Sequence, residues 1–85
     1  MAAFLVEAYL PSGDGASDLD ELFRASDALT AAGTRVVRTI FVPRDETCYI
    51  LCEADSVTLA QAAAEHAGLR VARVSEAVVA TAVGR

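Results

Sequence analysis

Strand-like and helical segments follow one another along this 85-residue chain in an order that few folds share. Runs rich in apolar and β-branched residues, bounded by turn-forming residues, predict strands. Four such runs are present, over residues 3–10, 35–42, 45–54 and 69–79. The sequence Pro43-Arg44-Asp45 forms a short connection between the middle two runs, so these two strands should pair in an antiparallel hairpin.

Two segments between these strands have helical spacing and begin with polar residues that favour a helix N-cap. The predicted caps are Ser17 or Asp18 for the first helix and Asp55 or Ser56 for the second, and the predicted stops are Gly33 and Gly68. The predicted stripes are Leu19, Leu22, Phe23, Ser26 and Leu29 in the first helix, and Ala60, Ala63, Ala64 and Ala67 in the second. The small side chains of the second stripe should let that helix pack close to the sheet.

The resulting order, β-α-β-β-α-β, predicts a single α+β domain over residues 1–85. Its expected architecture is a ferredoxin-like plait, a four-stranded antiparallel sheet with two helices on one face. The other face should stay open to solvent, to a ligand or to a second subunit. The fourth strand has a mixed pattern that a β-bulge would explain.

Side chains of a strand alternate between the two faces of a sheet, and the fully apolar set should meet the helices. This set is Phe4, Val6, Ala8 and Leu10, with Cys48, Ile50 and Cys52. The set expected on the open face is Leu5, Glu7 and Tyr9, with Tyr49, Leu51 and Glu53. In the second strand, Arg38 should share its side with Val36, Ile40 and Val42.

Glu7 and Glu53 are the main candidates for a site, because a carboxylate in a strand is costly unless it is paired, hydrated or coordinating something. In the usual spatial order of this fold, 4-1-3-2, their strands are neighbours, so the two glutamates should approach one another on the open face. Tyr9, Tyr49 and Arg38 should lie around them and contact a bound cofactor or ligand. A structural ion pair with Arg38 or another arginine is the alternative.

The only histidine, His66, falls late in the second predicted helix. A hydrated or helix-capping histidine is the ordinary interpretation at this position. An imidazole combined with carboxylates would also suit nickel, zinc or copper. The candidate metal ligands are therefore Glu7, Glu53 and His66, and such a site should need ligands from a second subunit.

Cys48 and Cys52 lie on one strand, so their Cα atoms should be about 13 Å apart. A disulfide requires about 4.4 to 6.8 Å between Cα atoms, so the two residues cannot bridge one another there. Two buried, unreactive thiols are the expected state.

Composition limits the classes of partner and compartment. The chain carries 12 acidic and 7 basic residues and a net charge of −5, which disfavours nucleic acid as a partner. No run is long and apolar enough for a membrane span, and no basic amphipathic stretch suits a membrane surface. A hydrophobic fraction of 54% is high for so short a chain and predicts a homodimer or larger oligomer. The N-terminus does not resemble a signal peptide, which predicts a cytoplasmic location.

Four motifs resemble a family of short bacterial ferredoxin-like proteins that carry a domain of unknown function, some of them described as nickel-binding. The motifs are Phe4-Leu5-Val6-Glu7, Phe41-Val42-Pro43-Arg44-Asp45-Glu46-Thr47-Cys48-Tyr49, Cys52-Glu53-Ala54-Asp55 and Ala67-Gly68-Leu69. The resemblance implies a subunit that dimerises and binds nickel or another divalent transition metal, without an established reaction. Glu7, Cys48 and Glu53 are the residues that match the motifs.

The leading hypothesis for function is therefore a small cytoplasmic, dimeric metal-binding protein without catalytic activity. The first alternative is a cofactor-free enzyme of the dimeric ferredoxin-like type, acting on a small organic substrate with Glu53 or Glu7 as general base. The second alternative is a protein interaction module.

Overall fold

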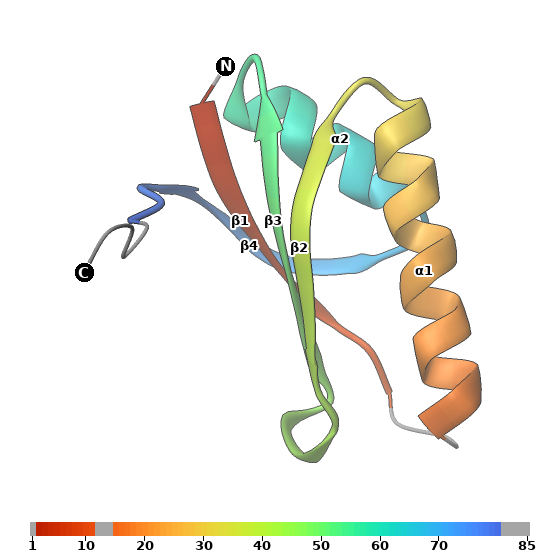
Figure 1. The fold of residues 1–85 in the computed structure, drawn as a ribbon. Coiled ribbons are helices and arrows are strands. Elements are labelled where there is room, and N and C mark those ends of the chain that lie inside the picture. The colour runs from red at the N-terminus through yellow and green to blue at the C-terminus, as the bar shows by residue number, and fades with distance from the viewer. Residues whose placement is uncertain (1, 12–14, 81–85) are drawn as a thin grey trace, which may run out of the picture.

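The computed structural model describes residues 2–11 and 15–80, in which strands and helices follow the predicted order (Figure 1). The elements are β1 (Ala2–Tyr9), α1 (Gly15–Ala31), β2 (Arg35–Val42), the 3-10 turn η1 (Pro43–Asp45), β3 (Thr47–Ala54), α2 (Val57–His66) and β4 (Arg70–Ala77). Among the described residues, no helix combines the length and the apolar character that a membrane crossing needs.

The sheet has the strand order β2-β3-β1-β4, and each neighbouring pair is antiparallel. Both helices lie on the same face of the sheet, and none of the described elements covers the opposite face (Figure 1). The ferredoxin-like plait predicted from the element order is confirmed. We call the uncovered side the open face.

The core fills the space between the sheet and the two helices. The central strands contribute alternate residues that are at most 4% exposed: Phe4, Val6, Ala8, Cys48, Ile50 and Cys52. The helices contribute Leu22, Ala25 and Leu29 from α1, and Ala60, Ala63 and Ala64 from α2. The predicted inward sides of β1 and β3 are confirmed, and so is the alanine stripe of α2, of which Ala67 is only partly buried.

The helix ends agree with the sequence at three of the four positions. Ser56 caps α2, because its Oγ accepts a hydrogen bond from the Leu59 N–H at 3.1 Å. Gly33 and Gly68 have φ angles of 97° and 88°, a left-handed conformation that glycine adopts without a Cβ penalty. The fourth position is wrong, because α1 begins at Gly15 and includes both predicted caps in its first turn.

The predicted stripe of α1 is also wrong at two positions. Leu19 and Phe23 are 47% and 60% exposed, whereas Leu22 and Leu29 are buried. The side of α1 that faces the sheet runs through positions 18, 22, 25 and 29, a spacing of four, three and four residues. Its first member is an aspartate, Asp18, so apolar character alone did not identify this side.

The predicted bulge in β4 is confirmed. Glu7 pairs with Arg73 but Ala8 pairs with Val71, so Ala72 is the extra residue. The bulge changes which residues of β4 face the helices, because each added residue reverses the alternation of side chains.

A second bulge, in β2, was not predicted. Val36 pairs with Cys52 and Arg38 pairs with Leu51, so Val37 is the extra residue. Val36 therefore packs against the core, while Arg38 stays on the open face. The prediction that Arg38 and Val36 share one side of the strand is wrong for this reason.

Two strand boundaries differ from the predicted ones by two residues, and the others by one residue or none. β3 begins at Thr47, because Glu46 adopts a left-handed φ of 51° where the 3-10 turn ends. β4 ends at Ala77, and the two valines that follow it are exposed.

Candidate functional site

The open face is a regular grid in which each row takes one residue from each of β2, β3, β1 and β4. In that order the rows are Arg35, Glu53, Ala3 and Ala77; Arg38, Leu51, Leu5 and Ser75; Ile40, Tyr49, Glu7 and Arg73; and Val42, Thr47, Tyr9 and Arg70. All the residues predicted for the open face of β1 and β3 are on it.

The two candidate glutamates do not meet, although both lie on the open face. Glu53 pairs with Ala3, whereas Glu7 pairs with Tyr49, so two full steps of the pleat separate them. Four residues along a strand correspond to about 13 Å. The prediction that the two carboxylates approach one another is wrong, because neighbouring strands do not bring residues together unless the register also places them opposite.

Each glutamate instead forms an ion pair with an arginine from an edge strand. Arg35 Nη1 donates to Glu53 Oε1 at 2.7 Å, and Arg73 Nη2 donates to Glu7 Oε1 at 3.1 Å. The glutamate side chains are 33% and 30% exposed, so these are partly hydrated surface pairs. The alternative of a structural ion pair is confirmed, with Arg35 and Arg73 as partners. Arg38 forms no ion pair with the residues that the structure describes.

The third candidate metal ligand lies on the other layer of the molecule. His66 is the last residue of α2 and is exposed, and the sheet separates α2 from the open face (Figure 1). Over residues 2–11 and 15–80, no three His, Cys, Asp or Glu residues cluster in a way that could hold a metal ion. Glu7, Glu53 and His66 of one chain therefore do not fit a nickel site. Binding of nickel or another divalent transition metal stays a prediction, and it requires ligands from two chains.

A calorimetric titration with Ni²⁺ tests this requirement. For protein without a polyhistidine tag we expect at most one ion per two chains, because no single chain brings the candidate ligands together. A variant that cannot dimerise should show no binding. One ion per chain, retained by that variant, would contradict the expectation.

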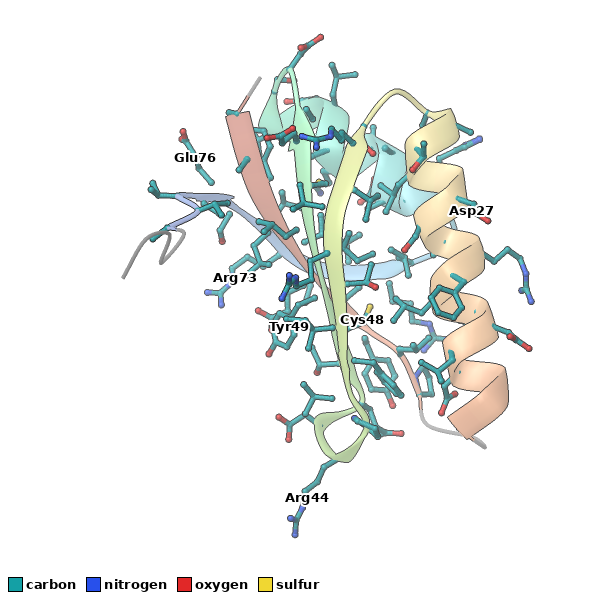
Figure 2. All side chains as sticks on the ribbon, viewed as in Figure 1. Asp27, Arg44, Cys48, Tyr49, Arg73 and Glu76 are labelled. Atoms are coloured by element: carbon teal, nitrogen blue, oxygen red, sulfur yellow. The ribbon has the colours of Figure 1, made fainter. Side chains whose placement is uncertain are left out.

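The two tyrosines of the open face differ in their surroundings. The Tyr9 hydroxyl donates to Glu46 Oε1 at 3.3 Å, and the Arg70 guanidinium lies 6.0 Å from the centre of the Tyr9 ring. This distance is at the outer limit of a cation–π contact. Tyr49 is half-buried and pairs with Glu7 and Ile40 across the sheet. Tyr49 and Arg73 project from the side of the sheet away from α1 (Figure 2).

The thiols Cys48 and Cys52 are free, as predicted, and both point to the helix side. Burial raises the pKa of the Cys52 thiol above its ordinary value. Burial is also the largest cause that raises the pKa of Cys48, and the Glu21 carboxylate contributes in the same direction. A thiol with a raised pKa is a poor nucleophile at neutral pH, so these residues suit a structural role.

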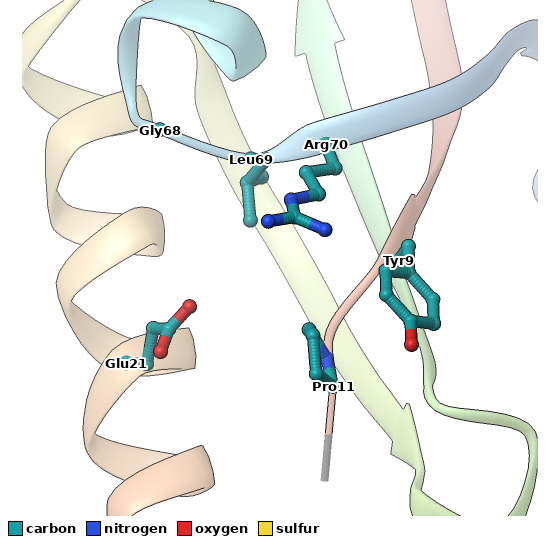
Figure 3. A pocket seen from close by; sticks show the side chains of 6 residues that line it. All are labelled: Tyr9, Pro11, Glu21, Gly68, Leu69 and Arg70. Atoms are coloured by element: carbon teal, nitrogen blue, oxygen red, sulfur yellow. The ribbon is translucent and has the colours of Figure 1, made fainter.

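Three cavities lie away from Glu7 and Glu53. A polar one of about 340 Å³ is lined by Tyr9, Pro11, Glu21, Gly68, Leu69 and Arg70 (Figure 3). An apolar one of about 420 Å³ lies between α1 and β2 and includes Leu19 and Phe23. The third follows the outer side of α2. Neither Glu7 nor Glu53 lines any of these three cavities, whereas a general base acts beside the cavity that holds its substrate; the enzyme alternative stays a prediction.

The polar cavity contains two charged residues that sequence reasoning did not select. Glu21 is one of several acidic residues close to the predicted start of the first helix, and Arg70 falls at the start of the strand with the mixed pattern. The sequence Gly68-Leu69-Arg70 could have indicated this position. A helix stop followed directly by a strand places Arg70 at the first residue of that strand, next to the end of α2.

Comparison with known proteins supports the fold. No family model matches the chain, and no curated protein matches it. A crystal structure of SCO4226 from Streptomyces coelicolor A3(2) is similar, with a TM-score of 0.76 and 20% sequence identity, and the match covers 94% of this chain and 100% of that one. At this identity the likeness shows a shared fold and not a shared activity: the chain is similar to SCO4226 in its α+β ferredoxin-like architecture.

Proposed function

We propose that the chain is a homodimeric binding protein without catalytic activity, and that two copies pair through their open faces. The observation that carries this proposal is the distribution of side chains over the grid. Its two middle rows hold an apolar and aromatic group, the apolar centre, made of Leu5, Leu51, Ile40 and Tyr49, beside Arg38, Ser75, Glu7 and Arg73. An exposed apolar patch on a small monomer is often an interaction site, and here the helices cover only the other face.

Charged residues lie beside this apolar centre in the middle rows and beyond it in the end rows of the open face. All four of its arginines belong to the edge strands, Arg35 and Arg38 to β2, and Arg70 and Arg73 to β4. An apolar centre with a polar rim that is rich in arginine is typical of protein interfaces. The ion pairs of this face are partly hydrated in the single chain, and the Glu7–Arg73 pair lies in a middle row, so dimerisation would desolvate that pair further.

A second copy is the partner that this face fits. In a twofold dimer the same surface meets itself, so the apolar centre of one chain would cover that of the other. Four arginines and two glutamates leave the face with a formal charge of +2 (4 − 2), and two copies therefore repel weakly. Salt screens this repulsion and should strengthen the dimer. An acidic partner protein would be bound more weakly as the salt concentration rises. The salt dependence of the dissociation constant therefore distinguishes a second copy of the chain from an acidic partner.

We also place this homodimer in the cytoplasm. Cys48 and Cys52 are both free and buried in the core. Secreted small domains usually use cysteines in disulfides, whereas the cytoplasm keeps thiols reduced.

Substitution of Ile40 tests the dimer. Ile40 is 50% exposed in the single chain and lies in the apolar centre of the open face. A carboxylate at this position would lose its hydration in the dimer, which is costly even beside Arg38. We expect the wild-type protein to be dimeric in sedimentation equilibrium and Ile40→Glu to raise the dissociation constant at least about tenfold.

Leu59→Glu is the matched control. Leu59 is 49% exposed and belongs to α2, on the opposite side of the sheet, so it receives the same charge at equal exposure. A glutamate at the third residue of a helix that begins with a serine cap is well tolerated. We expect this variant to dimerise as the wild type does. A wild-type chain that stays monomeric at every salt concentration, or equal weakening by both substitutions, would refute the proposal.

A further inference from the structure

The polar cavity lies where the end of β1, the first half of α1 and the start of β4 meet. Its wall consists of Tyr9 and Pro11, of Glu21 from α1, and of Gly68, Leu69 and Arg70 (Figure 3). The volume of about 340 Å³ is within the range of small-molecule sites.

Two opposite charges point into this cavity from different sides. Figure 3 shows the Glu21 carboxylate reaching in from α1 and the Arg70 guanidinium reaching in from β4. The two groups lie too far apart for an ion pair, and neither forms one with another described residue. Each group therefore keeps its hydrogen-bonding capacity for a ligand that enters between them.

A neighbouring aromatic ring helps to position one of the two charges, Arg70. The Arg70 guanidinium lies over the Tyr9 ring, and the Tyr9 hydroxyl is itself anchored on Glu46. A guanidinium that is already positioned loses less conformational entropy when a ligand binds.

We propose that this cavity binds a small zwitterion, a free α-amino acid, with the ligand carboxylate on Arg70 and the ligand ammonium on Glu21. A guanidinium and a carboxylate form paired, charge-assisted hydrogen bonds, and an ammonium donates to a carboxylate in the same way. A ligand with only one of the two charges would leave one protein group without a match. The proposal does not rest on the proposed dimer, although Tyr9 and Arg70 belong to an end row of the open face.

The experiment is a titration of the ¹⁵N-labelled full-length chain with each of the twenty amino acids, followed by two-dimensional NMR. We expect saturable shifts of the Gly68, Leu69 and Arg70 amide signals with at least one amino acid, since these residues line the cavity. The N-acetyl derivative of that amino acid lacks the ammonium group. The derivative in which the carboxyl group is converted to an amide lacks the carboxylate. Each derivative should bind about tenfold more weakly or not at all.

Variants assign the binding to the two charges. Arg70→Gln and Glu21→Gln should each raise the dissociation constant about tenfold. Arg44→Gln and Asp27→Asn are the controls, since both residues are exposed and lie away from the cavity (Figure 2). If Arg70→Gln does not fold, Glu21→Gln on the surface of α1 still decides the result. The absence of saturable shifts with every amino acid, equal binding of the single-charge derivatives, or equal losses in the controls would overturn the proposal.

Discussion

Ala64→Leu should lower the free energy of unfolding by about 1–3 kcal/mol, because overpacking a filled core forces side chains and backbone out of place. Ala64 is fully buried where α2 packs against the sheet. The neighbouring stripe residues Ala60 and Ala63 are also buried alanines. They have no large side chain that could move aside to make room for a leucine. Denaturation in urea, followed by circular dichroism at one fixed protein concentration, measures the change.

Ala62→Leu is the control for this prediction. It makes the same substitution in the same helix, but Ala62 is exposed. Leucine and alanine have similar helix propensities, so the change in stability should stay within about 0.5 kcal/mol. Equal effects of the two substitutions would mean that the close packing of α2 on the sheet does not determine the cost.

The faces of β1, β3 and α2 could be predicted because each carries a pattern with one interpretation. Alternate apolar residues such as Val6 and Ile50 identify the inward face of a strand, and a stripe of alanines identifies a helix side. The N-cap at Ser56 and the helix stops at Gly33 and Gly68 could also be predicted, because these residue types favour the local conformations that a helix end requires. These features depend only on neighbours in the sequence.

The arrangement of the candidate site could not be predicted, because it depends on register. Sequence reasoning placed Glu7 and Glu53 on adjacent strands and on the same face, and both statements are confirmed. The turn and the bulges decide which residues pair across neighbouring strands. No local sequence pattern indicates the bulge at Val37. The arginine partners of the two glutamates follow from this register and not from sequence proximity.

The α1 helix shows a different limit. An aspartate at position 18 occupies the inward side, and two exposed apolar residues, Leu19 and Phe23, lie beside it. The helical spacing of apolar residues therefore predicted a side of α1 that is rotated away from the buried side. The polar cavity was missed for a related reason. Glu21 and Arg70 belong to elements far apart in the chain, and they line one cavity only once the chain is folded.

The protein should lose stability as the pH rises above 9, through its two buried thiols. The pKa values of both Cys48 and Cys52 are raised from the ordinary value of 9.0, chiefly by burial. Below that pH both folded and unfolded chains keep the thiols protonated, so nothing changes. Above it the unfolded chain ionises while the folded chain holds its protons, and stability falls with pH until the folded thiols ionise too. The slope should reach about 1.4 kcal/mol per pH unit for each thiol.

Comparison with Cys48→Ala/Cys52→Ala isolates this contribution. Both proteins retain Tyr9, Tyr49 and every other group that ionises in this range, so only the difference between their slopes belongs to the thiols. Urea denaturation at several pH values between about 8 and 10.5, with a reducing agent present, should show a steeper loss for the wild type. Each single substitution should remove part of the difference, which keeps the test valid if the double variant is too unstable to measure. Parallel slopes would mean that the thiols ionise equally in the folded and unfolded chains, which contradicts their burial in the core.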